Sequence, residues 1–389
     1  MNPDPDLLIA GAGPAGIAAA LAGARRGLRT LLIDPAEEPG GEILAALHTE
    51  LCGLYTEKSP HDAADTLNAG IQREIAAGLH RLNPDRSNPI RRGRAVLLPF
   101  DPDAFRRLVA DLLDAESNLT TRLGVSVTGV TADAGRIDSV RLSTGESIRA
   151  ECVVDCTGNA AVARFAGLPL QDDAERASQL LGYGVQIDEI RGDMSMLRLA
   201  IPLALRKATE AGALPSHAAF TTFSAGPQSG EGIVRLVMPP EVAARTDTVK
   251  RFATAVFEQL RQRLPQHFRE AKISRTSPAP QERVGTRLKG EYTLTEEDVL
   301  SARKIDGDIP AVRNAWPMEI WRPENGPEYH FLPEGDWYEI PATCLTSPDL
   351  RNFACAGRCI SAAARAAAST RVAGTCFALG ELAIKALVV

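Results

Sequence analysis

Long hydrophobic runs and an excess of positive charge are both missing from this chain of 389 residues. No apolar stretch approaches the roughly 20 residues that a membrane-spanning helix needs. The 43 basic side chains are outnumbered by 49 acidic ones, so the formal net charge of −6 gives no reason to expect a nucleic acid or an anionic membrane as partner. The N-terminus lacks the basic region of a signal peptide, and we therefore expect a cytoplasmic protein.

The cysteines do not form the pattern of a disulfide framework. Their number, seven, is odd, and they are spread over a large chain, which favours reduced thiols. Cys152 with Cys156, and Cys355 with Cys359, have spacings that could suit a metal. Both pairs lie in or beside apolar, strand-like runs, where cysteine behaves as a small buried apolar residue. We therefore expect no metal site.

The most informative stretch runs from Asp6 to Asp34. An apolar run at 7–10 predicts a buried parallel strand, GAGPAG follows at 11–16, an alanine-rich helix reaches Arg25, and a second strand ends on Asp34. In this arrangement the first glycine permits a tight turn, the second lets the backbone approach a pyrophosphate, and the third lets the helix pack on the strand. The helix N-terminus favours phosphates, and Asp34 suits an unphosphorylated ribose.

The rest of the chain predicts an α/β protein whose first domain is completed by the C-terminus. The apolar strand and helix pattern of the N-terminus recurs later in the chain, as strands at 152–155 and 350–356 and a closing helix at 373–387. Ser369 or Thr370 is a candidate N-cap of that helix. The sequence between them alternates like an α+β domain. No second GxGxxG is followed by a strand and an acid, so the chain lacks an evident NAD(P)H-binding domain.

Six motifs together resemble the FAD-dependent oxidoreductase family, which is related to the fumarate reductase flavoproteins. They are GAGPAGIAAA, PGGEILAALHTELCG, VVDCTGNAAVARFAG, TRLKGEYTLTEEDVL, YEIPATCL and STRVAGTC. The first is shared by many flavoproteins, whereas the combination of GEYTLTEEDVL with STRVAGTC is specific. The resemblance implies a Rossmann-like, glutathione-reductase-type FAD-binding domain at 1–167 and 346–389. It also implies an interleaved α+β substrate or cap domain at 168–345.

The resemblance also implies which residues line FAD. The pyrophosphate would be surrounded by the opening turn, made of Gly11, Gly13, Pro14, Ala15 and Gly16. Asp34 would bind the adenosine ribose, the backbone of Val125 the adenine, and Gly158 would lie near the same half. The ribityl chain and the flavin would be lined by Gly40, Gly41, Gly357, Arg358, Arg371 and Val372. A helix N-terminus after Arg371 would stabilise the negative charge of the reduced flavin.

Two positions depart from the pattern of relatives. Many relatives carry histidine where this chain has Ala364, and they tend to carry another where Trp321 stands. Two proton-transfer groups are therefore missing, so this member uses other acids and bases or has a different or reduced activity.

The implied reaction is hydride transfer between a small organic substrate and flavin N5, with an unknown electron partner. Three residues are candidates for catalysis: Arg371, His48 and Arg287. In the segment RVGTRLKGEYTL, Arg283, Arg287 and Glu291 could bind an anionic substrate or brace the cap through ion pairs. Two alternatives stay open: an oxygen-activating monooxygenase or halogenase that uses an external reductant, and a flavoprotein with a non-redox or binding role.

Overall fold

A mixed sheet of six strands forms the centre of the molecule. The computed structural model describes residues 4–58, 62–171 and 179–387. The strand order is β21-β22-β10-β1-β2-β6, and every pair is parallel except the edge strand β21. The bounds are β1 (Leu7–Ala10), β2 (Thr30–Asp34), β6 (Leu119–Leu123), β10 (Cys152–Asp155), β21 (Thr346–Ser347) and β22 (Leu350–Cys355). The inner strand β1 is buried along its whole length, as its apolar sequence predicts.

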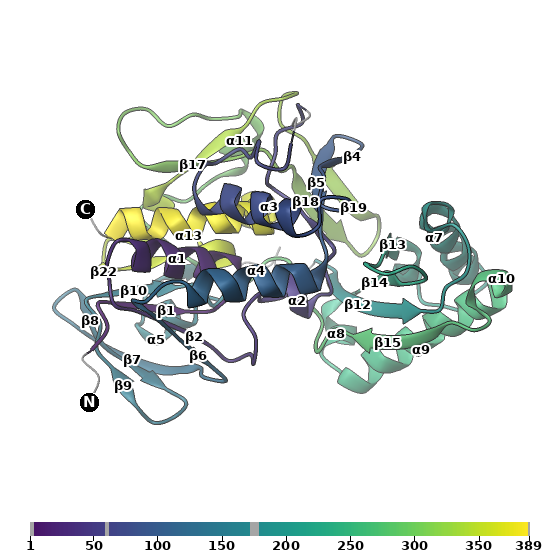
Figure 1. The fold of residues 1–389 in the computed structure, drawn as a ribbon, viewed down its shortest axis with the longest axis horizontal. Coiled ribbons are helices and arrows are strands. Elements are labelled where there is room, and N and C mark those ends of the chain that lie inside the picture. Colours follow the sequence, from purple (N-terminus) through teal and green to yellow (C-terminus); the bar gives the residue numbers. More distant parts are fainter. Residues whose placement is uncertain (1–3, 59–61, 172–178, 388–389) are drawn as a thin grey trace.

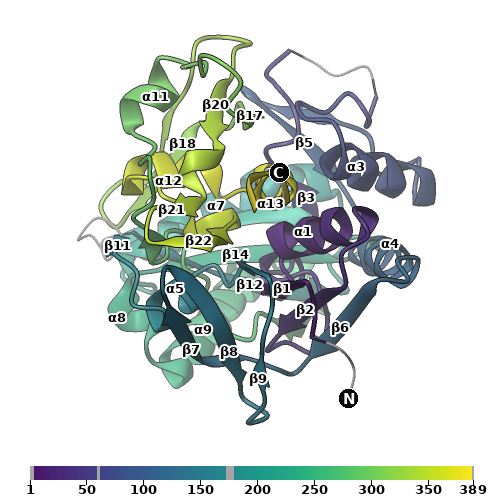
Figure 2. The same cartoon turned by 90° about the vertical axis from the view of Figure 1, so that its left-hand side faces the viewer.

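Helices cover one face of this sheet. The helical layer consists of α1 (Pro14–Arg25), α3 (Ile71–Leu82), α4 (Pro102–Asp114) and α13 (Ala373–Leu387). Figures 1 and 2 show α1 and α13 side by side, although they lie at opposite ends of the chain. A Cβ on Gly380 of α13 would come within 2.0 Å of the Ala15 carbonyl oxygen, so these two helices approach as closely as their backbones allow.

A small antiparallel sheet covers the other face. It consists of β7 (Val127–Asp133), β8 (Arg136–Leu142) and β9 (Ser147–Ile148), with the short helix α5 (Ala161–Phe165) beside it. Further short elements precede this sheet in the chain: α2 (Glu42–Ala45), β3 (Glu50–Leu51), β4 (Ile90–Arg92) and β5 (Ala95–Pro99). The six-stranded sheet, the helical layer and the small antiparallel sheet together form what we call the first body. It has three layers, with the six-stranded sheet in the middle (Figure 1).

A second antiparallel sheet, the cap sheet, has its own apolar core. Its order is β13-β14-β12-β15, and helices α7 and α9 pack against it. The bounds are β12 (Leu181–Asp188), β13 (Thr222–Ala225), β14 (Gly232–Met238), β15 (Lys272–Thr276), α7 (Met194–Glu210), α8 (Pro240–Ala243), α9 (Thr246–Arg263) and α10 (Pro265–Phe268). Val234, Leu236 and Met238 alternate along β14 and face these helices, which leaves Arg235 on the opposite face.

The chain then returns toward the first body through short strand pairs. Here β11 (Leu170–Gln171) pairs with β16 (Arg287–Leu288), β17 (Ala311–Asn314) with β20 (Tyr338–Pro341), and β18 (Met318–Arg322) with β19 (Gly326–His330). Two helices complete the region, α11 (Glu296–Leu300) and α12 (Ala364–Thr370).

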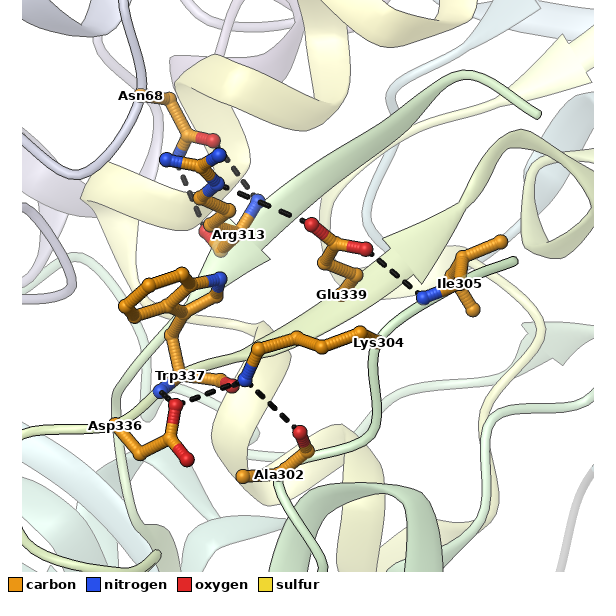
Figure 3. A network of polar contacts seen from close by, with 8 residues as sticks. All are labelled: Asn68, Ala302, Lys304, Ile305, Arg313, Asp336, Trp337 and Glu339. Carbon is orange, nitrogen blue, oxygen red and sulfur yellow. Dashed lines mark hydrogen bonds and ion pairs between the residues drawn. The ribbon is translucent and has the colours of Figure 1, made fainter. Parts of the chain in front are cut away.

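A polar network ties this region to the first body (Figure 3). The indole of Trp337 lies 4.5 Å from the Lys304 ammonium and 5.1 Å from the Arg313 guanidinium. Glu339 accepts the Ile305 N–H at 2.9 Å, and Asn68 accepts the Arg313 N–H at 2.8 Å. Because Asn68 precedes α3, the β17–β20 pair is fixed relative to the helical layer.

Several segments match the sequence prediction, and the α/β class with a Rossmann-like parallel sheet is confirmed. The strand at 152–155 and the helix at 373–387 have the predicted bounds. Helix α7 was not predicted. The N-cap prediction is wrong, because Ser369 and Thr370 form the last turn of α12, where the Ser369 hydroxyl donates to the Trp316 carbonyl at 2.5 Å.

The buried apolar residues group into separate cores. Most of those between Val284 and Leu345 belong to the core of the first body, whereas the core of the cap sheet spans Tyr183 to Ala271. The division into 1–167, 168–345 and 346–389 stays a prediction. Within the described ranges, no helix has the length and apolar character needed to cross a membrane.

Candidate functional site

The N-terminus of α1 offers backbone donors that the helix cannot use. Ile17 is the first residue whose N–H reaches a helical carbonyl, that of Gly13 at 2.9 Å. The amides of Ala15 and Gly16 come earlier in the first turn, and Pro14 has no amide hydrogen. Both residues are buried, so their amides need an acceptor from outside the helix. A phosphate group would supply it.

The three glycines of the turn differ in the space around them. A Cβ on Gly11 would lie 2.3 Å from the Cys156 carbonyl oxygen, and one on Gly16 would lie 1.6 Å from the Gly11 oxygen. A Cβ on Gly13 would meet nothing closer than the Gly41 Cα at 4.0 Å, and the φ of Gly13, −74°, suits any residue. Packing explains why Gly11 and Gly16 are glycines, whereas the open space beside Gly13 indicates room for a ligand.

Asp34 ends β2 beside this turn. Its carboxylate accepts the N–H of Ala12 at 2.5 Å and of Ala36 at 2.8 Å, which fixes its orientation. The Val125 N–H donates to the Asp34 backbone carbonyl at 2.9 Å, so Val125 lies next to the same strand end. An anchored carboxylate with unused lone pairs suits the hydroxyls of a ribose.

A second wall faces the turn across the open space. The Gly40 N–H donates to the Ala12 carbonyl at 2.8 Å, and a Cβ on Gly41 would lie 2.8 Å from the Gly13 Cα. Further along, Gly357 has φ +82° and approaches Ala15. Glycine is required here because side chains would close the space between the two walls.

Arg358 is engaged by backbone carbonyls rather than left free. Its Nε donates to Gly158 at 3.0 Å and its Nη1 to Glu282 at 2.5 Å. Gly158 itself has φ +78°, and a Cβ there would lie 3.1 Å from Arg358. In this arrangement Arg358 braces the strand end at Gly158 against the segment that leads back from the cap sheet.

Three guanidinium groups gather where the first body meets the cap sheet. Arg235 comes from β14, Arg283 from the segment after β15, and Arg371 from the junction of α12 with α13. Arg371 Nη2 donates to the Glu319 carbonyl at 3.3 Å and lies 3.7 Å from the Glu319 carboxylate. Burial opposes ionisation of Glu319, but Arg371 and Arg283 outweigh it and hold the pKa of that carboxyl below its ordinary value.

Trp321 connects Arg283 with Glu319. Glu319 and Trp321 are two residues apart in β18, so their side chains lie on the same face of the strand. The Trp321 indole Nε1 donates to the Glu319 carboxylate at 2.7 Å. The Arg283 guanidinium lies 4.0 Å from the centre of the Trp321 ring, in a cation–π contact. Trp321, one of the two positions expected to depart from the family pattern, therefore holds an arginine in place. Ala364, the other such position, is buried at the start of α12.

Arg235 fixes the loop that carries His48. Its two terminal nitrogens donate to the carbonyls of Ala46 and Leu47 at 2.8 and 2.9 Å. Leu47 has φ +56°, a costly conformation for a leucine, and these bonds help to hold it. Burial, then the charges of Arg235, Arg283 and Arg371, hold the pKa of His48 well below its ordinary value. His48 is therefore neutral near pH 7 and keeps a ring nitrogen with a free lone pair, and the same burial and cations make it a weak base.

The structure brings together two of the three predicted catalytic residues. His48 and Arg371 lie at the same junction, whereas Arg287 is fully buried elsewhere, with its Nε donating to Ala362 at 2.7 Å and its Nη1 to Gly285 at 2.8 Å. These are the contacts of a bracing residue. Val372 packs with Leu97 and Trp316 behind Arg371.

Arg235 and Glu319 were not predicted from the sequence. The signal for Arg235 was present, because a single arginine interrupts the apolar strand GIVRLVM. Glu319 carried no such signal, since MEIWR reads as an ordinary alternating strand.

Comparison with known proteins identifies the family of this chain. Residues 6–386 match the sequence model of the family described as FAD dependent oxidoreductase. The chain belongs to this family. A curated relative, sarcosine oxidase subunit alpha of Rhizobium meliloti (strain 1021), is 41% identical over 64 residues, which cover 16% of this chain and 6% of that protein.

Solved structures show the likeness of the fold. A geranylgeranyl bacteriochlorophyll reductase-like protein from Thermoplasma acidophilum is 12% identical, with a TM-score of 0.50 over 97% of this chain and 76% of its own. The flavin-dependent monooxygenase PieE, solved with FAD and substrate, is 15% identical, with a TM-score of 0.43 over 75% of this chain and 52% of its own.

FAD is the cofactor of this enzyme, and the residues of the first body fit it. The free amides of α1, the open space beside Gly13 and the anchored Asp34 carboxylate match a pyrophosphate joined to an adenosine ribose. The finer assignment to the glutathione-reductase type stays a prediction, as do the contacts of the individual residues.

The different surroundings of the turn glycines predict different effects of mutation. Gly13→Val fits the backbone and should leave the melting temperature of the FAD-free protein nearly unchanged while abolishing FAD binding. Gly16→Ala should instead destabilise the protein by about 1–3 kcal/mol, because its Cβ meets a backbone oxygen. Absorbance of the purified flavoprotein and thermal melts separate the two effects. Retained FAD in Gly13→Val would contradict the assignment of this space.

Proposed function

We propose that this oxidoreductase exchanges a hydride between a small organic substrate and N5 of FAD, at the junction of the first body with the cap sheet. One observation carries the proposal: the two chain segments that form the walls of the phosphate site lead directly to the junction. The segment after Gly41 carries His48, and the segment after Gly357 carries Arg371. The turn around Gly13 would hold the phosphates of FAD, and the imidazole and cationic groups on these segments would surround its reactive end.

The chemistry divides between cofactor and protein. FAD, when bound, supplies a centre that accepts or releases two electrons with a proton. When a substrate is oxidised, its C–H bond gives up the hydride and its neighbouring O–H or N–H bond gives up a proton. Neutral His48 is the group that can accept this proton, and the bonds from Arg235 to Ala46 and Leu47 position it.

Arg371 acts through charge. It precedes α13, where the helix dipole is also positive, and it lies against the partly buried carboxylate of Glu319. The cation favours added negative charge nearby, and Glu319 opposes it. The pair therefore sets the electrostatic environment in which electrons are accepted.

A reduction experiment tests the proposed reaction. The flavoprotein is reduced anaerobically with light and then mixed with small organic acceptors, and the oxidised form is mixed with small organic donors. We expect at least one of them to change the flavin absorbance rapidly, and micromolar NADPH to have no such effect. Fast reoxidation by air with release of peroxide would instead indicate oxygen chemistry. No response to any donor or acceptor would indicate a non-redox role.

The charges of Arg371 and Glu319 predict opposite shifts of the flavin reduction potential. Each interaction is worth on the order of 1 kcal/mol, and about 1.4 kcal/mol corresponds to roughly 30 mV for two electrons. Arg371→Met should lower the potential by a few tens of millivolts, and Glu319→Gln should raise it, with FAD still bound in both. The measurement is a dye-equilibrated redox titration. Unchanged potentials in both variants would place the pair away from the flavin.

The half-buried, neutral His48 predicts a pH effect on stability. Its folded pKa lies below the ordinary value, so below about pH 6.5 the unfolded chain binds a proton that the folded protein does not. The free energy of unfolding should fall by up to about 1.4 kcal/mol per pH unit from pH 6.5 down to the folded pKa. Above pH 6.5 the effect should be absent. His48→Gln should remove this part of the acid sensitivity in urea titrations. An identical pH profile in the variant would show that His48 is not buried as a neutral group.

A further inference from the structure

The junction holds more positive charge than its own carboxylates balance. Burial lowers the pKa of Arg235 to about 10. Burial and the nearby Arg371 lower the pKa of Arg283 to about 9. Both groups therefore stay cationic at pH 7. In the part of the chain that the structure describes, Glu319 is the one carboxylate within 4 Å of any of the three guanidinium groups.

Other groups near the junction do not neutralise it. The negative charge of Glu50 acts to raise the pKa of Arg235. The Glu50 carboxylate, however, already lies 2.7 Å from the Arg92 guanidinium and 3.4 Å from that of Arg198. Burial holds the pKa of Tyr329 above its ordinary value, so this phenol carries no charge at pH 7, and Cys52 is kept neutral in the same way. Three arginines against Glu319 leave a surplus of two positive charges.

Arg283 has donors available for a ligand. Its Nε–H is used by the Leu180 carbonyl at 3.0 Å, and the stack on Trp321 fixes the plane of the guanidinium. Its two terminal nitrogens have no hydrogen bond or ion pair with any residue in the described ranges. Arg371 adds a buried Nε that has no partner there either. The buried Arg371 Nε is costly to leave unpaired unless something binds it, whereas the terminal nitrogens of the half-buried Arg283 are accessible to a ligand.

The position of this surplus is set by the fold on both sides. Val237 and Leu180 pack against Trp321, so the Arg235 face of the cap sheet borders the same space as Arg283. Gly184 of β12 lacks a side chain where the Ala46 carbonyl approaches, at 2.8 Å from the Cβ it would carry. The cap sheet and the loop before His48 are therefore in direct contact, with the arginines along the seam.

We propose that the substrate of this enzyme carries a carboxylate group, and that Arg283, with Arg371 beside it, is its binding residue. A carboxylate matches the planar fork of a guanidinium and supplies the missing acceptors. The bound carboxylate brings the rest of the substrate next to His48. This proposal rests on the proposed function for its location at the reaction site, but the binding it predicts requires no turnover.

The test compares an anion with its neutral isostere on the oxidised holoprotein. Calorimetric titration with benzoate should show saturable binding, and titration with benzamide, which has the same shape without the charge, should show none. Arg283→Met should weaken benzoate binding about 10- to 100-fold, since it removes charge-assisted hydrogen bonds. Arg283→Lys should lie between. Arg245→Met, which removes an exposed arginine at the start of α9, should bind benzoate like the wild type.

Each result decides the proposal. Equal binding of benzoate and benzamide, no binding of either, or unchanged affinity in Arg283→Met would overturn it, as would binding of inorganic phosphate with no binding of benzoate. FAD content and melting temperature check that each variant is folded. If Arg283→Met does not fold, the comparison of benzoate with benzamide on the wild type still decides the charge preference. Benzoate binding in a protein whose flavin no donor reduces would preserve the anion site and refute the proposed reaction.

Discussion

The structure depends on the close contact between the first strand, the glycine turn and the first helix. Gly16 and Gly11 touch backbone to backbone, so α1 starts directly above the carboxyl end of β1. This contact has two consequences. It aims the free amides of α1 at the open space beside Gly13, and it leaves a flat, alanine-rich helix surface on which α13 can lie. The cofactor site and the attachment of the C-terminus thus come from one packing constraint.

The return of the C-terminus decides what stands near the glycine turn. Because β22 adds to the parallel sheet beside β10, and α13 then packs on α1, the N-terminal end of α13 is brought to the same side as the glycine turn. Arg371 is placed there by this topology. Its neighbour Val372 is held by Trp316 and Leu97, and a Cβ on Gly53 would lie 2.4 Å from Val372, so the position of the helix start is fixed from several sides.

The cap sheet contributes the positive charge of Arg235 to the junction. Its inner face, where Arg235 interrupts an apolar strand, closes against the loop before His48. The β18–β19 hairpin adds Glu319 and the Trp321 platform from a third direction. The low pKa of His48 is a result of this assembly, since burial and three cations act on it together.

The sequence by itself determined the parts that depend on local patterns. The turn at 11–16, the acid at Asp34 and the strand at 152–155 are defined by neighbours in sequence, because tight turns and buried strands restrict the residues within them. The closing helix at 373–387 was predicted for the same reason. Arg371 and His48 were predicted as candidates because they follow such motifs, whereas helix α7, which contains Pro202, was not predicted.

Only the tertiary structure decided which distant side chains share a space. Arg287 and Arg283 stand four residues apart in one motif, yet Arg287 is enclosed by carbonyls in the core and Arg283 faces the junction. Arg235 and Glu319 lie far from either in sequence and join the site through strands of two different sheets. Alternation along a strand gives the face of a side chain but not what that face meets, because the partner surface is chosen by packing across the whole fold.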